Sequence, residues 1–225
     1  MYAFALTQTL FLLSLVNAAP MGRLDKRDTD LNPSRCPDFC AGTTRSGDVT
    51  QFVCGDPRLG PVALPTGIPL AAVAGSASTY HRFGGLCPGD YLAKWTGFDG
   101  LYVYPGSSGF ALDTAGRPMA GNLTLSAGTL LDRFGSEYGS FMSPAGAPYA
   151  QRALPPTNLN AASGAAYPFN YHVYAVARPL VVLAGPIAPW FGQPAMGVQF
   201  QMLKAVGGLV DDGYLVKVNT SALGE

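Results

Sequence analysis

Short extended segments follow one another through the second half of the chain. Six segments are extended in character, most of them rich in aromatic, β-branched or leucine residues: 101–104, 123–125, 171–176, 180–183, 197–203 and 214–218. Turns containing glycine or proline separate many of them, which is typical of strands in an antiparallel sheet. The pattern therefore predicts an α+β fold that is mainly antiparallel β.

One or two short helices are expected beside these strands. Residues 129–134 read Thr-Leu-Leu-Asp-Arg-Phe and precede Gly135, which is typical of a short helix ending at a glycine. Asp211-Asp212-Gly213 precedes the last predicted strand and indicates a hairpin turn. Residues 87–225 are therefore interpreted as the main domain. Residues 28–86 have few periodic stretches and are interpreted as a small N-terminal subdomain.

The start of the chain has the features of a secretory signal peptide. An apolar run over 10–16 is followed by the small residues of Val16-Asn-Ala-Ala19, and the run is shorter than a bilayer requires. Residues 1–19 are thus predicted to be removed. A propeptide over 20–27 would end at Lys26-Arg27, so that the mature chain begins at Asp28. We expect a protein that is secreted, and extracellular or associated with the cell surface.

The cysteine count agrees with that compartment. The chain has four cysteines, Cys36, Cys40, Cys54 and Cys87. An even number of cysteines behind a signal peptide indicates disulfides, here two, with three possible pairings. A metal site would need two close pairs of ligands, and only the first two cysteines are close. Asn122-Leu-Thr and Asn219-Thr-Ser are N-glycosylation sequons.

Composition and charge exclude several classes of protein. Hydrophobic residues make up 48% of the 225 positions, which excludes disorder as the main state. The formal net charge is zero and charged residues are only 12%, which argues against a nucleic-acid partner. The 28 glycines and 19 prolines disfavour a helix bundle.

Three polar residues lie in apolar or glycine-rich surroundings: Arg133, Arg152 and Gln199. Arginines that are sparse on an apolar sheet are candidates for binding phosphate, because the guanidinium group matches it with two parallel hydrogen bonds. The alternative is that each arginine makes an ordinary ion pair. The sequence has no Gly-x-Ser-x-Gly motif of a serine hydrolase. The turn Gly106-Ser-Ser-Gly109 lacks the lysine of a phosphate-binding loop.

A series of motifs carries a more specific resemblance. In order they are Asp132-Arg-Phe-Gly135, Ser143-Pro-Ala-Gly-Ala-Pro148, Arg152-Ala-Leu-Pro-Pro156, Tyr171-His-Val-Tyr174, Gly185-Pro-Ile-Ala-Pro-Trp-Phe-Gly192 and Gly197-Val-Gln-Phe200. Between about residues 87 and 205 the chain closely resembles the tuberculosis necrotizing toxin (TNT) domain family, especially its secreted fungal-type members. The resemblance implies a fold related to ADP-ribosyltransferases and an NAD glycohydrolase activity that releases nicotinamide and ADP-ribose. Residues 28–86 resemble the cysteine-bearing extension of the fungal members.

The resemblance also implies roles for single residues. Arg133 and Arg152 would hold the pyrophosphate, and Gln199 would hydrogen-bond a ribose hydroxyl or the attacking water. Aromatic side chains would pack on the nicotinamide or the ribose: Phe134, Phe141 and Trp190. His172 matches a histidine on the strand before the long loop. Phe141 stands where the family also has tyrosine, so no hydroxyl acts there.

Several alternatives remain open at this point. Many ADP-ribosyl-transferring enzymes have a glutamate where Gln199 lies, and an amide there favours water as the acceptor. The competing functions are an ADP-ribosyltransferase and a non-enzymatic secreted surface or binding protein. NAD(P) is expected as the substrate, with no cofactor required, and a homodimer is expected from the fungal-type relatives. Asp211 and Asp212 could also contribute to a structural calcium site with Glu225.

Overall fold

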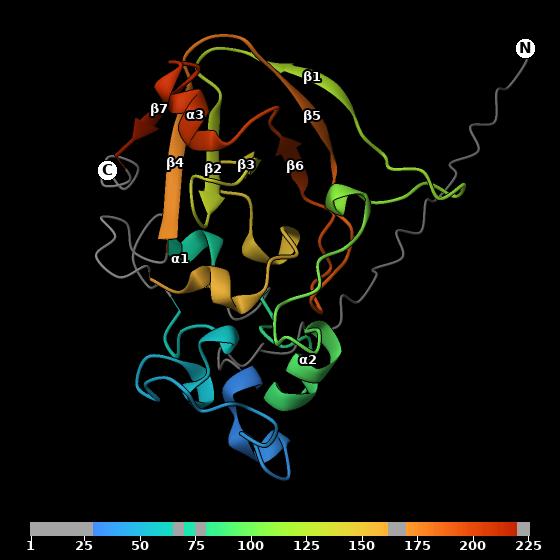
Figure 1. Cartoon of the computed structure of the whole chain (residues 1–225), viewed down its shortest axis with the longest axis vertical. Coiled ribbons are helices and arrows are strands. Elements are labelled where there is room, and N and C mark those ends of the chain that lie inside the picture. Colours follow the sequence, from blue (N-terminus) through green and yellow to red (C-terminus); the bar gives the residue numbers. More distant parts are fainter. Residues whose placement is uncertain (1–28, 65–69, 75–79, 162–169, 220–225) are drawn as a thin grey trace, which may run out of the picture.

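An antiparallel sheet dominates the computed structural model, which describes residues 29–64, 70–74, 80–161 and 170–219. Within these residues seven strands pair in the order β1-β5-β6-β3-β2-β4-β7, all antiparallel. The strands are β1 (Gly121–Leu125), β2 (Leu130–Phe134), β3 (Phe141–Pro144), β4 (Tyr171–Val176), β5 (Leu180–Pro186), β6 (Val198–Gln201) and β7 (Leu215–Val218). The α-helices are α1 (Leu70–Val73), α2 (Pro88–Trp95) and α3 (Val206–Asp211). The predicted mainly antiparallel α+β fold is confirmed (Figure 1).

Three local predictions were wrong. Residues 130–134 form the strand β2 rather than a helix, because they pair with β3 on one side and β4 on the other. Tertiary pairing of this kind overrides a weak local preference. Residues 101–104 form no strand, and only Tyr102 makes an isolated bridge, to Thr96. The Asp211-Asp212-Gly213 turn ends helix α3 rather than closing a hairpin.

The two faces of the sheet have different neighbours. Because side chains alternate along a strand, Leu131 and Phe200 point to one face, where they pack with Val206 and Leu209 of α3. Side chains at the neighbouring strand positions point to the opposite face, and they include Asp132, Phe134 and Gln199. That second face is covered by residues 149–159, whose apolar side chains include Tyr149 and Leu159. Among the motif residues on strands, Asp132, Phe134 and Gln199 therefore point to this second face, whereas Arg133 and His172 are in step with Leu131 and Tyr174 of the α3 face.

The N-terminal region lies below the sheet in Figure 1 and is held by two disulfides. Cys36 pairs with Cys87, and Cys40 pairs with Cys54, which decides among the three pairings. The first disulfide ties the region to the start of α2. A cluster of buried side chains joins the same parts, and it includes Leu59, Tyr91 and Phe191. The predicted domain boundary at residue 87 stays a prediction, since α2 packs together with the N-terminal region.

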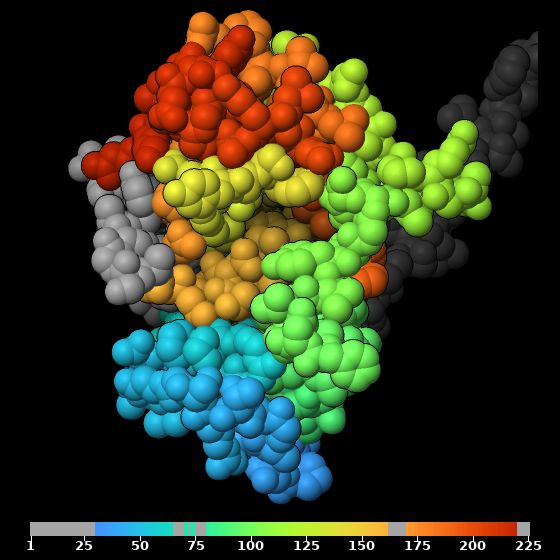
Figure 2. Space-filling view, in the orientation of Figure 1, coloured from blue at the N-terminus to red at the C-terminus, as the bar shows by residue number. Residues whose placement is uncertain are grey.

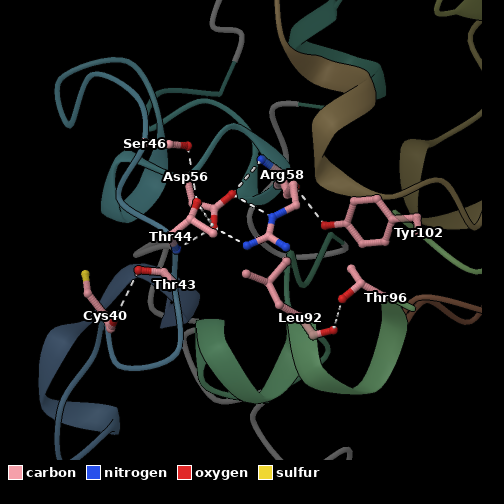
Figure 3. A network of polar contacts seen from close by, with 9 residues as sticks. All are labelled: Cys40, Thr43, Thr44, Ser46, Asp56, Arg58, Leu92, Thr96 and Tyr102. Atoms are coloured by element: carbon pink, nitrogen blue, oxygen red, sulfur yellow. Dashed lines mark hydrogen bonds and ion pairs between the residues drawn. The ribbon is translucent and has the colours of Figure 1, made fainter. Parts of the chain in front are cut away.

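A polar network around Asp56 fixes this region to the segment after α2 (Figure 3). The buried Asp56 carboxylate accepts hydrogen bonds of 2.9 and 2.6 Å from the Arg58 guanidinium and of 3.0 Å from Thr44. The Tyr102 hydroxyl donates to the backbone carbonyl of Arg58 over 2.7 Å. The network thereby anchors residue 102, two positions before the wall of the cavity described below.

Candidate active site

A cavity of about 340 Å³ lies on the second face of the sheet. Figure 2 shows a hollow on this side of the molecule, between the yellow segment near residue 140 and the green segment near residue 105. The lining residues come from β2, β3, β6, the 104–109 segment, the 152–158 segment and the position after β5: Tyr104, Pro105, Ser108, Gly109, Arg133, Phe134, Phe141, Arg152, Ala153, Leu154, Asn158, Ile187 and Gln199. A smaller pocket continues inward to Asp132 and Ser143. Elements far apart in the sequence thus build one concave site.

Gln199 reaches this cavity from β6. Its backbone is opposite Gly185 in β5, and its side chain is only 8% exposed. The amide Nε2 donates a hydrogen bond of 2.8 Å to the backbone carbonyl of Ser108. A glutamine held in this way offers its Oε1 as a hydrogen-bond acceptor, and an uncharged amide cannot act as a Brønsted base.

Arg133 lies near the end of β2, where its backbone directs the side chain to the α3 face, and yet this long cationic side chain also lines the cavity. Its Nε donates to the carbonyl of Ser136 and its Nη1 to the carbonyl of Phe141, both over 2.7 Å. Burial lowers the pKa of Arg133, yet a guanidinium keeps its charge at neutral pH. Among the residues that the structure describes, no carboxylate pairs with it. The positive charge of Arg133 is therefore available to an anionic ligand.

Arg152 is held differently, although it lines the same cavity. Its Nη1 and Nη2 donate to the two carboxylate oxygens of Asp132 over 2.5 and 2.8 Å. The side chains of this pair are 3% and 0% exposed. Nε and Nη2 also donate to the carbonyl of Ala147. Asp132 accepts two more hydrogen bonds, from the Tyr171 hydroxyl and from the Gly146 N–H. Arg152 is thus part of a buried, neutralised network at the cavity wall.

The aromatic residues named from the sequence separate into two groups. Phe134 and Phe141 line the cavity. Phe134 also packs edge-on against Tyr149, with ring centres 5.0 Å apart. Trp190 is not among the lining residues. Its Nε1 donates to the carbonyl of Val103 over 2.7 Å, and its ring packs against Trp95. Trp190 therefore supports the 101–104 segment from behind instead of facing the cavity.

His172 lies in a different hollow. As the cross-strand partner of Arg133 it points to the α3 side of the sheet. There it lines a second, more open cavity of about 540 Å³ together with Glu137 and Asp211. Its Nε2 lies 2.9 Å from the Asn170 side-chain oxygen, and burial lowers its pKa. The structure consequently does not bring His172 together with Gln199.

Comparisons with known proteins show which family the chain belongs to. The family model described as tuberculosis necrotizing toxin matches residues 124–218. The conidial surface nicotinamide adenine dinucleotide glycohydrolase nadA of Aspergillus fumigatus is 50% identical over 223 residues, covering 97% of this chain and 93% of that protein. The chain belongs to the tuberculosis necrotizing toxin family. The solved structure of that toxin with its immunity factor aligns over 95% of this chain and 100% of its own, at 18% identity and a TM-score of 0.39.

The sequence analysis missed several residues at the cavity. Tyr104 and Ser108 lie before residue 124 and therefore outside the part matched by the tuberculosis necrotizing toxin model. Asp132 stands inside a motif already quoted, but its role depends on Arg152, which is 20 residues away. Asn158 follows the Arg152 motif, and its amide lies 3.5 Å from the Phe134 carbonyl. The only signal for Asp132 in the sequence was its place next to Arg133, and that position does not reveal its pairing with Arg152.

A metal site receives no support from the residues described. Among the described residues, no group of three or more His, Cys, Asp or Glu side chains could hold a metal ion. Asp212 pairs with Lys204. Glu225, the third ligand named for calcium, lies outside the described residues. A calcium site near the end of the chain stays a prediction.

Proposed function

We propose that the chain is an NAD glycohydrolase that cleaves the bond between nicotinamide and ribose. The observation that carries this proposal is the convergence of Gln199, Arg133, Phe134 and Phe141 in one cavity, in a chain that is 50% identical to an NAD glycohydrolase. An uncharged acceptor, a cation and apolar ring surfaces match the ribose, the pyrophosphate and the nicotinamide of the substrate. NADP is a second candidate substrate, because it contains the same groups.

The protein has little covalent chemistry to perform in this reaction. Nicotinamide leaves with the electron pair of its bond to ribose, and the anomeric carbon develops positive charge. Water adds to that carbon and loses a proton to solvent, giving nicotinamide, ADP-ribose and H⁺. Catalysis then depends on holding the reactants in the reactive geometry and on stabilising developing charge. No cofactor is needed for these steps.

Each residue of the cavity has a proposed role. Arg133 holds the pyrophosphate, because its charge has no carboxylate partner among the described side chains. Arg152 shapes the wall with its charge balanced by Asp132, and it keeps at most one N–H, on Nη1, for the substrate. Phe134 and Phe141 pack on the nicotinamide or the ribose. Gln199 accepts a hydrogen bond from a ribose hydroxyl or from the attacking water.

Product analysis tests the activity and separates it from its alternatives. Purified protein is incubated with NAD, and nicotinamide and free ADP-ribose are quantified by chromatography. Equal amounts of both products support a glycohydrolase, and Gln199→Ala is the control that should abolish them. Nicotinamide without free ADP-ribose would identify an ADP-ribosyltransferase. No loss of NAD would contradict both and leave a surface or binding protein.

We further propose that the chain is processed, glycosylated and exported. The signal peptide and the Lys26-Arg27 pair lie outside the described residues, and no helix among those described is long and apolar enough to cross a membrane. Asn122 on β1 and Asn219 after β7 are both exposed, which supports their use as glycan sites. N-terminal sequencing of protein from the medium should give Asp28 as the first residue. Digestion by an N-glycosidase should lower the mass in two steps, and light scattering tests the expected homodimer.

A further inference from the structure

The backbone of Ser108 contacts the proposed catalytic side chain directly. Ser108 is exposed, but its carbonyl oxygen accepts the 2.8 Å hydrogen bond from Nε2 of Gln199. Gly109 lies against the same amide, since a Cβ at residue 109 would be 3.7 Å from both Nε2 and Oε1. The 106–109 turn therefore lies beside the amide group and bonds to its Nε2 end.

This carbonyl is held by a strained turn. The backbone φ values are 54° at Ser107, 54° at Ser108 and 76° at Gly109. They lie in the left-handed region, which residues other than glycine seldom adopt. Three backbone hydrogen bonds keep the turn in place: Gly109 N–H to Gly106, Phe110 N–H to Ser107, and Ala188 N–H to Gly109. The last bond ties the turn to the segment after β5, the strand beside β6. Strain retained next to a site is a recurring sign of function.

We propose that the carbonyl of Ser108 is a positioning group that requires an amide at residue 199. A carbonyl oxygen accepts hydrogen bonds only, so the side chain that meets it must donate. Gln199 donates through Nε2 and consequently directs Oε1 into the cavity. The proposal rests on the proposed function and adds a reason why glutamine, and not glutamate, stands on this strand.

The fixed orientation also limits what Gln199 can bind. An Oε1 acceptor pairs with an O–H group, which the ribose hydroxyls and the attacking water both have. It does not pair with the oxygens of a pyrophosphate, which are acceptors themselves. A glutamate at this position would place a carboxylate oxygen against the Ser108 carbonyl, and the two acceptors would repel each other. The carboxylate would then turn away from the geometry that Gln199 has.

Two proline substitutions in the same turn test the proposal. Ser108→Pro is incompatible with φ 54° and should displace the carbonyl, whereas Gly106→Pro is compatible with φ −62° and serves as the matched control. We expect Ser108→Pro to lower kcat by ~100-fold, the scale of losing one oriented hydrogen bond at a reacting centre. The Kd for ADP, which has the pyrophosphate but lacks the ribose next to Gln199, should change by less than about 3-fold in calorimetry, because Arg133 is untouched. Gly106→Pro should retain the kcat of the parent protein.

Substitutions of Gln199 give a second test that does not depend on refolding of the turn. If the carbonyl rejects a carboxylate, Gln199→Glu should be as inactive as Gln199→Ala, within about 3-fold in kcat. A Gln199→Glu variant with near-parental kcat, or a Ser108→Pro variant with parental kcat and melting temperature, would overturn the proposal. A lower melting temperature with unchanged kcat would mean a structural role only and would overturn it too. Absence of NAD cleavage by the parent protein would instead contradict the proposed function.

Discussion

Arg152 and Asp132 form a two-point ion pair at the wall of the cavity, with both side chains almost fully excluded from solvent. The Tyr171 hydroxyl and the Gly146 N–H also donate to Asp132, so this carboxylate joins β2, β4 and the turn after β3. Arg133, which lines the same cavity, has no carboxylate partner among the described residues. The two arginines therefore differ in what they can give to a substrate.

Alanine substitutions of the two arginines should have different effects. Arg152→Ala leaves the Asp132 carboxylate buried without its partner, which typically costs about 3–5 kcal/mol of stability. Arg133→Ala removes a charge held only by backbone carbonyls, so we expect a KM for NAD raised at least about 10-fold and a melting temperature close to that of the parent. Differential scanning calorimetry and steady-state kinetics measure the two effects.

The double variant Asp132→Leu/Arg152→Met is the control for this comparison. Replacing both partners by apolar side chains removes the unpaired charge, so it should recover much of the stability lost in Arg152→Ala. An Arg152→Ala protein with an unchanged melting temperature and a strongly raised KM would contradict the assignment. In that case Arg152 would be the main ligand of the pyrophosphate.

Gly139 offers a way to move Arg133 without replacing it. A Cβ at residue 139 would overlap the Arg133 guanidinium, whereas the backbone of Gly139 itself is not in the left-handed region. Gly139→Ala should therefore push the end of the Arg133 side chain aside at little cost in stability. We expect a raised KM for NAD with a small change in kcat, measured by initial rates. Gly121→Ala is the matched control, since a Cβ there meets nothing. Equal kinetics for the two variants would show that Arg133 does not bind the substrate where the cavity places it.

Much of the fold was predictable because aromatic and β-branched residues between turns with glycine or proline are a local signal of a strand. The strands over 171–176 and 197–203 were expected within a few residues of β4 and β6. The segment 130–134 was misread as a helix because its strand pairing is with residues 141–144 and 171–176, which no local pattern reveals. Long-range pairing thus decided the one element that carries both Asp132 and Arg133.

The cavity was predictable only in part. Motif reasoning placed Arg133, Arg152 and Gln199 together, and the structure brings all three to one cavity. It gave Trp190 a position at the substrate, whereas the indole packs behind the 101–104 segment. The Ser108 contact could not be foreseen, because it depends on a backbone conformation 91 residues before Gln199. Side-chain identity predicts candidate chemistry, and backbone geometry decides which candidates meet.

The two disulfides should differ in their effect on stability. Cys36–Cys87 closes a loop of 51 residues and Cys40–Cys54 a loop of 14. Chain entropy then gives about 4 kcal/mol for the first and about 3 kcal/mol for the second. We expect Cys36→Ser/Cys87→Ser to have the lower melting temperature and to expose the α2 segment to limited proteolysis. Faster cleavage in Cys40→Ser/Cys54→Ser instead would mean that packing, and not the longer loop, holds α2 in place.

Asp56 should make the protein sensitive to acid. Burial alone would raise the pKa of Asp56, but the hydrogen bonds from Arg58 and Thr44 outweigh it and lower the pKa to about 2. The unfolded value is 3.8, so the ion pair stabilises the fold fully above that pH and loses its contribution as the pH falls toward 2. The difference corresponds to about 2 kcal/mol. The free energy of unfolding, measured with urea between pH 6 and pH 2, should decrease accordingly. This range extends about 2 pH units to either side of the unfolded pKa.

Asp56→Asn isolates this contribution, since the amide keeps the shape of the side chain without its titration. The variant should be less stable than the parent at pH 6, and the difference should shrink by about 2 kcal/mol toward pH 2 because the parent then loses the same charge. Asp113→Asn is the matched control, as Asp113 pairs with the largely exposed Arg117 and solvent screens that pair.

Because the Tyr102 hydroxyl bonds to the Arg58 carbonyl, Asp56→Asn should also loosen the segment that leads to Tyr104. A difference between Asp56→Asn and parent that stays constant across the pH range would show that Asp56 is not titrating as an ion-paired carboxylate.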